Sequence, residues 1–187
     1  MTKRKNLYNV IPLDSKLAKK VIHEAENDIN KGVSPNGLYY TAYSDKVKNE
    51  KLGRGTMTIG DGVAETSDAP RHWFSGKPIL AKDVDDWTYN KLVEGDVAIR
   101  AAYDDKYGTP SDPNPSSRLG MKPRLGAAQV RYQQYRLGKN TDIVLDALHH
   151  GNDTYLGTAL YIAGKQNSGG RGRIKRVEKV FGNSYYK

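Results

Sequence analysis

The feature that most constrains the fold is a long helical pattern near the middle of the chain. Residues 81–103 contain no proline, and Gly95 weakens the pattern without ending it. The apolar residues recur on one side of a helix. They are Val84, Trp87, Leu92, Ile99 and Ala102. We therefore expect one long helix here, with the other elements arranged around it.

The segment before this helix predicts an arm, a shorter helix and a β-hairpin. Residues 1–14 are basic at the start and have no helical period, which is typical of an arm. Ser15 is a good cap for a helix over 16–31. Residues 37–43 and 56–59 favour two antiparallel strands joined by a charged loop, 46–55.

The segment after the hairpin predicts irregular structure at 61–78, and the three prolines in 109–120 predict an exposed loop. The rest of the chain predicts shorter helices, at 124–137, 141–150, 153–164 and 172–181. The order of elements predicts an α+β fold.

We divide the expected fold into a 1–14 arm and a 15–187 domain. Within the domain we expect a hairpin lobe at about 36–78, an interlobe helix at about 81–103 and a larger helical lobe at about 120–181.

Composition narrows the partners but does not choose one. The 187 residues carry a formal charge of +9, which favours an anionic partner such as nucleic acid, a membrane surface or a bacterial envelope. The absence of cysteine excludes disulfides and thiolate metal sites. The first residues contain no apolar run of signal-peptide length and the sequence contains none of membrane-spanning length, so we expect neither a signal peptide nor a membrane span.

Two motifs frame the hairpin. The first is Tyr43-Ser44-Asp45, and the second is Thr58-Ile59-Gly60-Asp61-Gly62. The sequence Asn36-Gly37-Leu38 begins nine positions before Asp45. In this pattern the chain resembles phage-type lysozymes, the muramidases of tailed phages related to the T-even enzyme. That family has Glu-Gly-Leu, Tyr-x-Asp and Thr-x-Gly-x-Gly in this order.

The resemblance extends over roughly residues 30–181. The segment 76–87 is similar to the start of the family's interlobe helix, and 169–181 is similar to its basic C-terminal segment. The resemblance implies a lysozyme-like fold and a site at the hairpin. The arm, the enlarged loop at 46–55 and the proline-rich loop depart from the family pattern.

The matched site lacks its acid. The resemblance implies that Asp45 and Thr58 position and activate a water molecule, while the family's Glu protonates the leaving oxygen. Asn36 stands at that Glu position, and a carboxamide has no proton to release near neutral pH. Glycoside hydrolysis usually needs two carboxyl groups, so loss of the acid predicts little turnover.

Four other carboxylates are alternatives for a relocated acid. Glu26 and Glu24 lie on the expected first helix, Glu50 lies in the hairpin loop, and Asp61 follows Thr58 closely. Each position also has a simpler interpretation. Glu24 and Glu26 would be solvated charges on a helix, Glu50 a flexible loop charge and Asp61 a turn residue.

Two further features have simple structural interpretations. His149-His150 ends an expected helix and has no third ligand at zinc-like spacing, so we expect no metal site. The basic residues between Arg171 and Lys179 accompany no recognised nucleic-acid module, which makes nucleic acid an unlikely partner. We expect no cofactor.

Three hypotheses remain open. The first is a lysozyme-fold phage protein of the virion or tail with lost or weak hydrolysis, whose partners are peptidoglycan glycan strands or other virion subunits. The second is an active muramidase with a relocated acid, acting at the cell envelope. The third is a basic nucleic-acid-binding protein. For the first two, the location is the virion or the infected bacterial cell.

Overall fold

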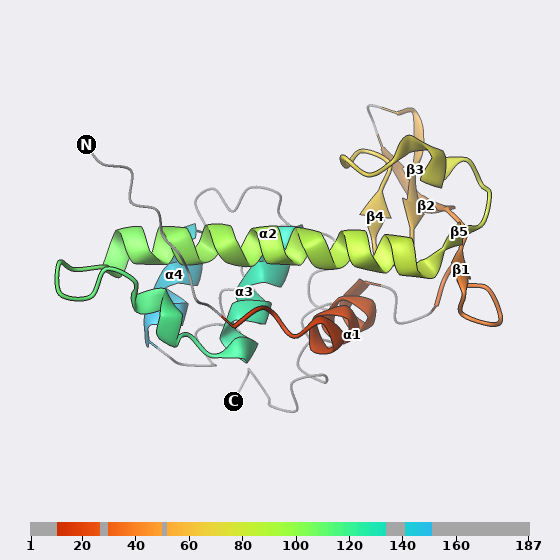
Figure 1. Cartoon of the computed structure of the whole chain (residues 1–187). Helices are drawn as coiled ribbons and strands as arrows, with labels where there is room; N and C mark the ends of the chain where they lie inside the picture. Colours follow the sequence, from red (N-terminus) through yellow and green to blue (C-terminus); the bar gives the residue numbers. More distant parts are fainter. Residues whose placement is uncertain (1–10, 27–29, 50–51, 134–140, 151–187) are drawn as a thin grey trace, which may run out of the picture.

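The computed structural model describes residues 11–26, 30–49, 52–133 and 141–150. The described chain is an α+β fold, as the sequence predicts (Figure 1). Its helices are α1 (Ser15–Glu26), α2 (Ala81–Tyr107), α3 (Met121–Gln133) and α4 (Thr141–His150). Its strands are β1 (Tyr39–Tyr40), β2 (Tyr43–Asn49), β3 (Arg54–Ile59), β4 (Val63–Ala64) and β5 (Ile79–Leu80).

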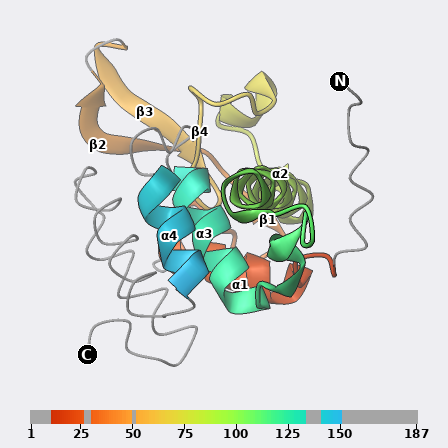
Figure 2. The same cartoon turned by 90° about the vertical axis from the view of Figure 1, so that its left-hand side faces the viewer.

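Helix α2 runs along the whole molecule and connects its two parts. In Figure 1 the sheet of β2, β3 and β4 lies at the N-terminal end of α2, and α3 and α4 lie beside its C-terminal half. Figure 2 views α2 nearly along its axis and shows α1 below it and α3 and α4 to its left. None of the helices in the described residues is long and apolar enough to cross a membrane.

The strands of the hairpin are longer, and the loop between them is shorter, than the sequence predicts. The expected loop at 46–55 is wrong at both ends, because Lys48 pairs with Gly55 and Asn49 pairs with Arg54. The two strands continue past the apolar positions because backbone pairing does not depend on apolar side chains. The register shifts between Ser44 and Lys48, which marks an irregularity in β2.

Two smaller pairings complete the β structure. Strand β4 pairs with β3, and this places two residues of the segment 61–78 in a sheet where irregular structure was expected. A 3₁₀ turn at Arg71–Phe74 follows. Strands β1 and β5 form a separate antiparallel pair at the start of α2.

The helix boundaries differ from the predicted ones in three places. Helix α1 ends at Glu26, whereas the sequence predicts a helix to residue 31. Asn30 has a φ of 51°, which is not a helical value. Helix α2 continues four residues past 103, to Tyr107, and Gly108 follows it as a C-cap with extended backbone. Helix α3 begins at Met121, three residues earlier than predicted.

Other helix predictions are confirmed or remain outside the described residues. The helix at 141–150 is confirmed as α4. The proline-rich segment is a loop that contains only a short 3₁₀ turn, Pro115–Arg118. The expected helices at 153–164 and 172–181 lie outside the described residues, as does most of the arm.

Apolar side chains form two cores, and α2 contributes to both. The first core lies among the four helices and includes Ile22, Leu92 and Leu125. The second lies between the strands and the N-terminal end of α2 and includes Ile59 and Val84. Because Val84 and Leu92 belong to the same helix, α2 fixes the position of the strands relative to the helices.

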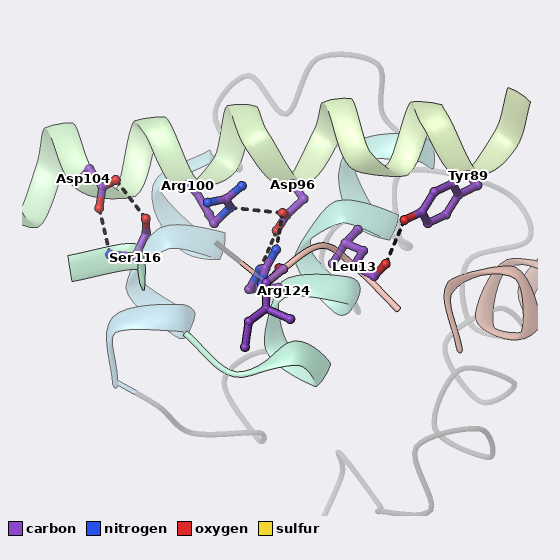
Figure 3. Close-up of polar contacts among 8 residues, drawn as sticks. Leu13, Tyr89, Asp96, Arg100, Asp104, Ser116 and Arg124 are labelled. Carbon is purple, nitrogen blue, oxygen red and sulfur yellow. Dashed lines mark hydrogen bonds and ion pairs between the residues drawn. The ribbon is translucent and has the colours of Figure 1, made fainter. Parts of the chain in front are cut away.

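A buried ion network fastens α3 to α2 (Figure 3). Asp96 of α2 accepts hydrogen bonds from Arg100 at 3.1 Å and from two nitrogens of Arg124, at 3.0 and 2.6 Å. All three side chains are at least nine-tenths buried. Buried charges of this kind need partners, and here one carboxylate is shared by two guanidinium groups.

The same region anchors the end of the expected arm. Arg124 donates a hydrogen bond to the carbonyl oxygen of Ile11 at 2.9 Å, and the Tyr89 hydroxyl donates to that of Leu13 at 2.8 Å (Figure 3). The Leu13 side chain is buried in the helical core. Asp14 then caps α1 by accepting from the Leu17 amide.

Candidate functional site

The Gly60–Gly62 turn between β3 and β4 packs against the second core. A Cβ atom on Gly60 would lie 2.8 Å from both Tyr40 and Val84, and its φ is 53°. Only glycine therefore fits without displacing its neighbours. This turn brings the residue between the glycines, Asp61, against the helices.

Asp61 joins the turn to α1 and α3. Its carboxylate lies 2.9 Å from Nδ1 of His23, and only 5% of the Asp61 side chain is exposed, against 36% for His23. The hydroxyl of Tyr132 in α3 donates a hydrogen bond to the Asp61 carbonyl oxygen at 3.2 Å. A buried carboxylate thus holds a partly exposed imidazole in a fixed orientation.

A second carboxyl group lies beside this pair. The Tyr40 hydroxyl donates to Oδ1 of Asp85 at 3.0 Å. Burial raises the pKa of Asp85, and the charge of Asp61 raises it further, whereas the Tyr40 hydrogen bond and the nearby Lys19 and His23 lower it. The pKa of Tyr40 is raised by burial first and then by Asp61 and Asp85.

We call His23, Tyr40, Asp61 and Asp85 the interlobe cluster. Its members come from α1, β1, the β3–β4 turn and α2, so it lies where the strands meet the helices. A partly exposed pair flanks it, in which Lys19 donates to Asp86 at 2.7 Å. The hydrogen bonds of Asp86 to Lys19 and Lys82 lower the pKa of Asp86.

The two residues matched to the water-handling pair lie on adjacent strands. Thr58 in β3 is 6% exposed and stands opposite Tyr43 in β2. Asp45 follows Tyr43 by two positions, at the register shift in β2. The backbone therefore brings the two strands together as the sequence predicts, and the role of Asp45 and Thr58 stays a prediction.

Asn36 lies at an exposed turn. Its side-chain oxygen accepts hydrogen bonds from the Ser34 hydroxyl at 2.7 Å and from the Leu38 amide at 3.1 Å. Both partners belong to the same turn. The residue that contacts the Gly60–Gly62 turn from the preceding helix is His23, not Asn36.

The alternative acids fall at different places. Glu24 and Glu26 lie in the last turns of α1, and Glu50 lies outside the described residues. Asp61 is brought into the interlobe cluster, where it pairs with an imidazole. Whether any of these residues acts as an acid stays a prediction.

Sequence reasoning missed His23, Tyr40 and Asp85. Lys19 and His23 are four positions apart on a helix, so they share a face, and this spacing was the available signal. Asp85 stands in an acidic run that looks like a solvated helix start. Its hydrogen bond to Tyr40 joins residues 45 positions apart, and no local pattern predicts such a contact.

Metal binding finds no support among the residues that the structure describes, where no group of three or more potential ligands lies together. His149 instead stacks on Tyr107 at a centroid distance of 3.9 Å. Comparison of the chain with models of protein families, with curated proteins and with solved structures found no match.

Proposed function

We propose that this chain is a lysozyme-fold phage protein of the virion or tail that contacts peptidoglycan strands or neighbouring subunits and no longer cleaves glycans. Support comes from the hairpin carrying Asp45 and Thr58, from the glycine turn and from the long helix between two cores. Their order along the chain is the one that the resemblance to phage-type lysozymes leads us to expect, and the support it gives is support by analogy.

The observation that best supports the loss of hydrolysis is the chemistry and hydrogen bonding of the Asn36 side chain. Its amide oxygen is occupied by two donors of its own turn, and the amide has no proton to give a leaving group. General acid catalysis typically contributes about 10²–10⁴-fold to such reactions. Without it, Asp45 and Thr58 would hold a water molecule but would not drive cleavage.

One observation favours the alternative of an active muramidase with a relocated acid. Asp85 is a half-buried carboxyl group whose pKa is raised, which is the property a general acid needs. It also lies in the interlobe cluster, beside the turn that follows Thr58. In this alternative Asp85 gives the proton and Asp45 handles the water.

The test measures binding and cleavage separately. Purified peptidoglycan is mixed with the wild type, and binding is read from co-sedimentation while cleavage is read from loss of turbidity. We expect binding without clearing. The variants Asn36→Glu and Asp45→Ala show whether restoring an acid restores clearing and whether Asp45 is needed for it.

A cleaving wild type would overturn the proposal. If clearing is then lost in Asp85→Asn but kept in Asp83→Asn, the relocated-acid alternative gains support, because Asp83 is an exposed acid two positions away on α2. Absence of both binding and clearing would contradict contact with glycan strands and would leave contact with other virion subunits.

A further inference from the structure

The exposed turn at Asn36 carries the one Asn-Gly pair in the chain. Pro35 occupies its second position, and the Gly37 amide donates to the Ser34 carbonyl oxygen at 2.8 Å. Asn36 and Gly37 are both exposed, and a Cβ atom on Gly37 would meet nothing within 4 Å. The turn is therefore open to solvent at both residues.

We propose that Asn36 is a site of spontaneous deamidation in the folded protein, assisted by the Ser34 hydroxyl and the Leu38 amide. Both groups donate hydrogen bonds to the Asn36 side-chain oxygen, at 2.7 and 3.1 Å. That oxygen gains negative charge when the side-chain carbonyl is attacked. The two donors stand where they stabilise this charge, as the donors of an oxyanion hole do.

The attacking group is the backbone nitrogen of Gly37. It forms a bond to Cγ of Asn36, and its proton is lost to solvent. The bond from Cγ to the side-chain nitrogen then breaks, and this nitrogen takes up a proton and leaves as ammonia. Water hydrolyses the resulting succinimide at either carbonyl, which gives aspartate or isoaspartate and lowers the formal charge by one.

Glycine at position 37 makes this attack feasible. It has no side chain to block the approach to Cγ, and its φ of 69° shows a backbone conformation that other residues rarely adopt. The attack requires the hydrogen bond from the Gly37 amide to Ser34 to open. Asn114 provides the contrast, because Pro115 follows it and a proline nitrogen has no proton to lose.

This inference stands apart from the proposed function, because it needs only the geometry of the turn. It bears on that function in one respect. The product places a carboxyl group at the position matched to the family's Glu, although aspartate is one methylene shorter than glutamate.

The experiment follows the intact, purified chain during incubation at mildly alkaline pH. Peptide mapping by mass spectrometry measures conversion at residue 36, and isoaspartyl methyltransferase labels the isoaspartate. A synthetic peptide of residues 34–39 provides the unfolded reference. We expect conversion at residue 36 in the protein at least as fast as in the peptide, and none in Asn36→Gln.

The Ser34→Ala variant tests the assistance. Loss of one hydrogen bond to the developing charge should slow conversion roughly fivefold, the rate equivalent of about 1 kcal/mol. Circular dichroism checks that the variant is folded. An Asn36 that stays an amide while the peptide converts would overturn the proposal, and an unchanged or faster rate in Ser34→Ala would overturn the assisted mechanism. Neither result depends on peptidoglycan binding or cleavage.

Discussion

Two aspartates of α2 show how burial changes the contribution of the same residue type. Asp96 and Asp86 each contact two cationic side chains, but 3% of the Asp96 side chain is exposed against 41% of Asp86. Removing the charge of Asp96 leaves Arg100 and Arg124 buried without their shared carboxylate. Removing that of Asp86 leaves Lys19 and Lys82 in contact with water.

We therefore expect Asp96→Asn to lower the free energy of unfolding by about 3–5 kcal/mol and Asp86→Asn to lower it by about 1 kcal/mol or less. Urea denaturation followed by circular dichroism measures both values. Equal losses in the two variants would contradict the interpretation of Asp96 as the central residue of a buried network.

The raised pKa of Asp85 fixes the sign of its effect on the pH dependence of the unfolding free energy. Because burial raises its pKa in the folded state, the folded chain binds this proton more tightly than the unfolded chain does. The contribution of Asp85 to the unfolding free energy therefore falls as pH rises from about 4, the ordinary value for aspartate, through the raised pKa.

Asp85→Asn should remove this loss, because the amide is uncharged and its oxygen still accepts from Tyr40. We expect the variant to be more stable than the wild type at neutral pH, with the difference disappearing in acid. Thermal unfolding across pH measures this, and Asp83→Asn is the exposed control. A variant that is less stable at neutral pH would show that the Asp85 charge has partners strong enough to offset its burial.

At the scale of elements, the segment that enters α1 behaves as part of the helical core. Leu13 is 3% exposed whereas Ile11, two positions earlier, is 76% exposed. We expect Leu13→Ala to lower the free energy of unfolding by about 2–5 kcal/mol. Ile11→Ala should change it by about 0.5 kcal/mol or less. Chemical denaturation of the two variants measures the difference.

Comparable effects in both variants would mean that residues 11–14 contribute as a loosely held segment. The pair is well matched, since both carbonyl groups accept hydrogen bonds, from Arg124 and Tyr89, that the alanine substitutions leave in place.

The elements that the sequence predicts well are those with a strong local pattern. The apolar period of α2 and the sharp limits of α4 locate both helices, because these signals come from neighbouring residues. The extension of β2 to Asn49 and of β3 back to Arg54 was missed because the charged residues of this segment are poor indicators of a strand. Pairing across the hairpin decides the structure there.

The candidate site divides in the same way. Thr58, Asp61 and Asp45 follow from a local motif, so the sequence points to them. His23, Tyr40 and Asp85 become neighbours of Asp61 only when α1, β1 and α2 meet, and this depends on tertiary packing. The sequence signals the glycine turn but contains no local signal for what the turn contacts.

At the scale of the whole molecule, charge is distributed unevenly along the chain. The described residues hold 17 of the 30 Lys and Arg residues and 17 of the 21 Asp and Glu residues. The remaining 13 basic and 4 acidic residues therefore carry the entire formal charge of +9. Seven of these basic residues lie in 151–187, together with two acidic ones.

For the proposed contact with peptidoglycan, this distribution predicts which residues would draw the chain to the anionic cell wall. Salt screens exposed charges from one another beyond the Debye length, which is about 8 Å at physiological salt. Charges that lie close together therefore attract a polyanion more strongly than the same number of scattered charges. The sequence from Arg171 to Lys179 holds five basic residues and one acidic residue. The described residues have a formal net charge of zero, with 17 basic and 17 acidic residues.

We compare two triple variants that share a formal charge of +6. One replaces Arg171, Arg173 and Arg176 with Gln, and the other replaces the exposed Lys16, Lys20 and Lys77 with Gln. Co-sedimentation with purified cell walls at increasing salt should show the larger loss of binding, and the weaker salt dependence, in the arginine variant. Equal losses would mean that net charge alone governs attraction, and unchanged binding in both would show that contacts other than charge hold the protein to the wall.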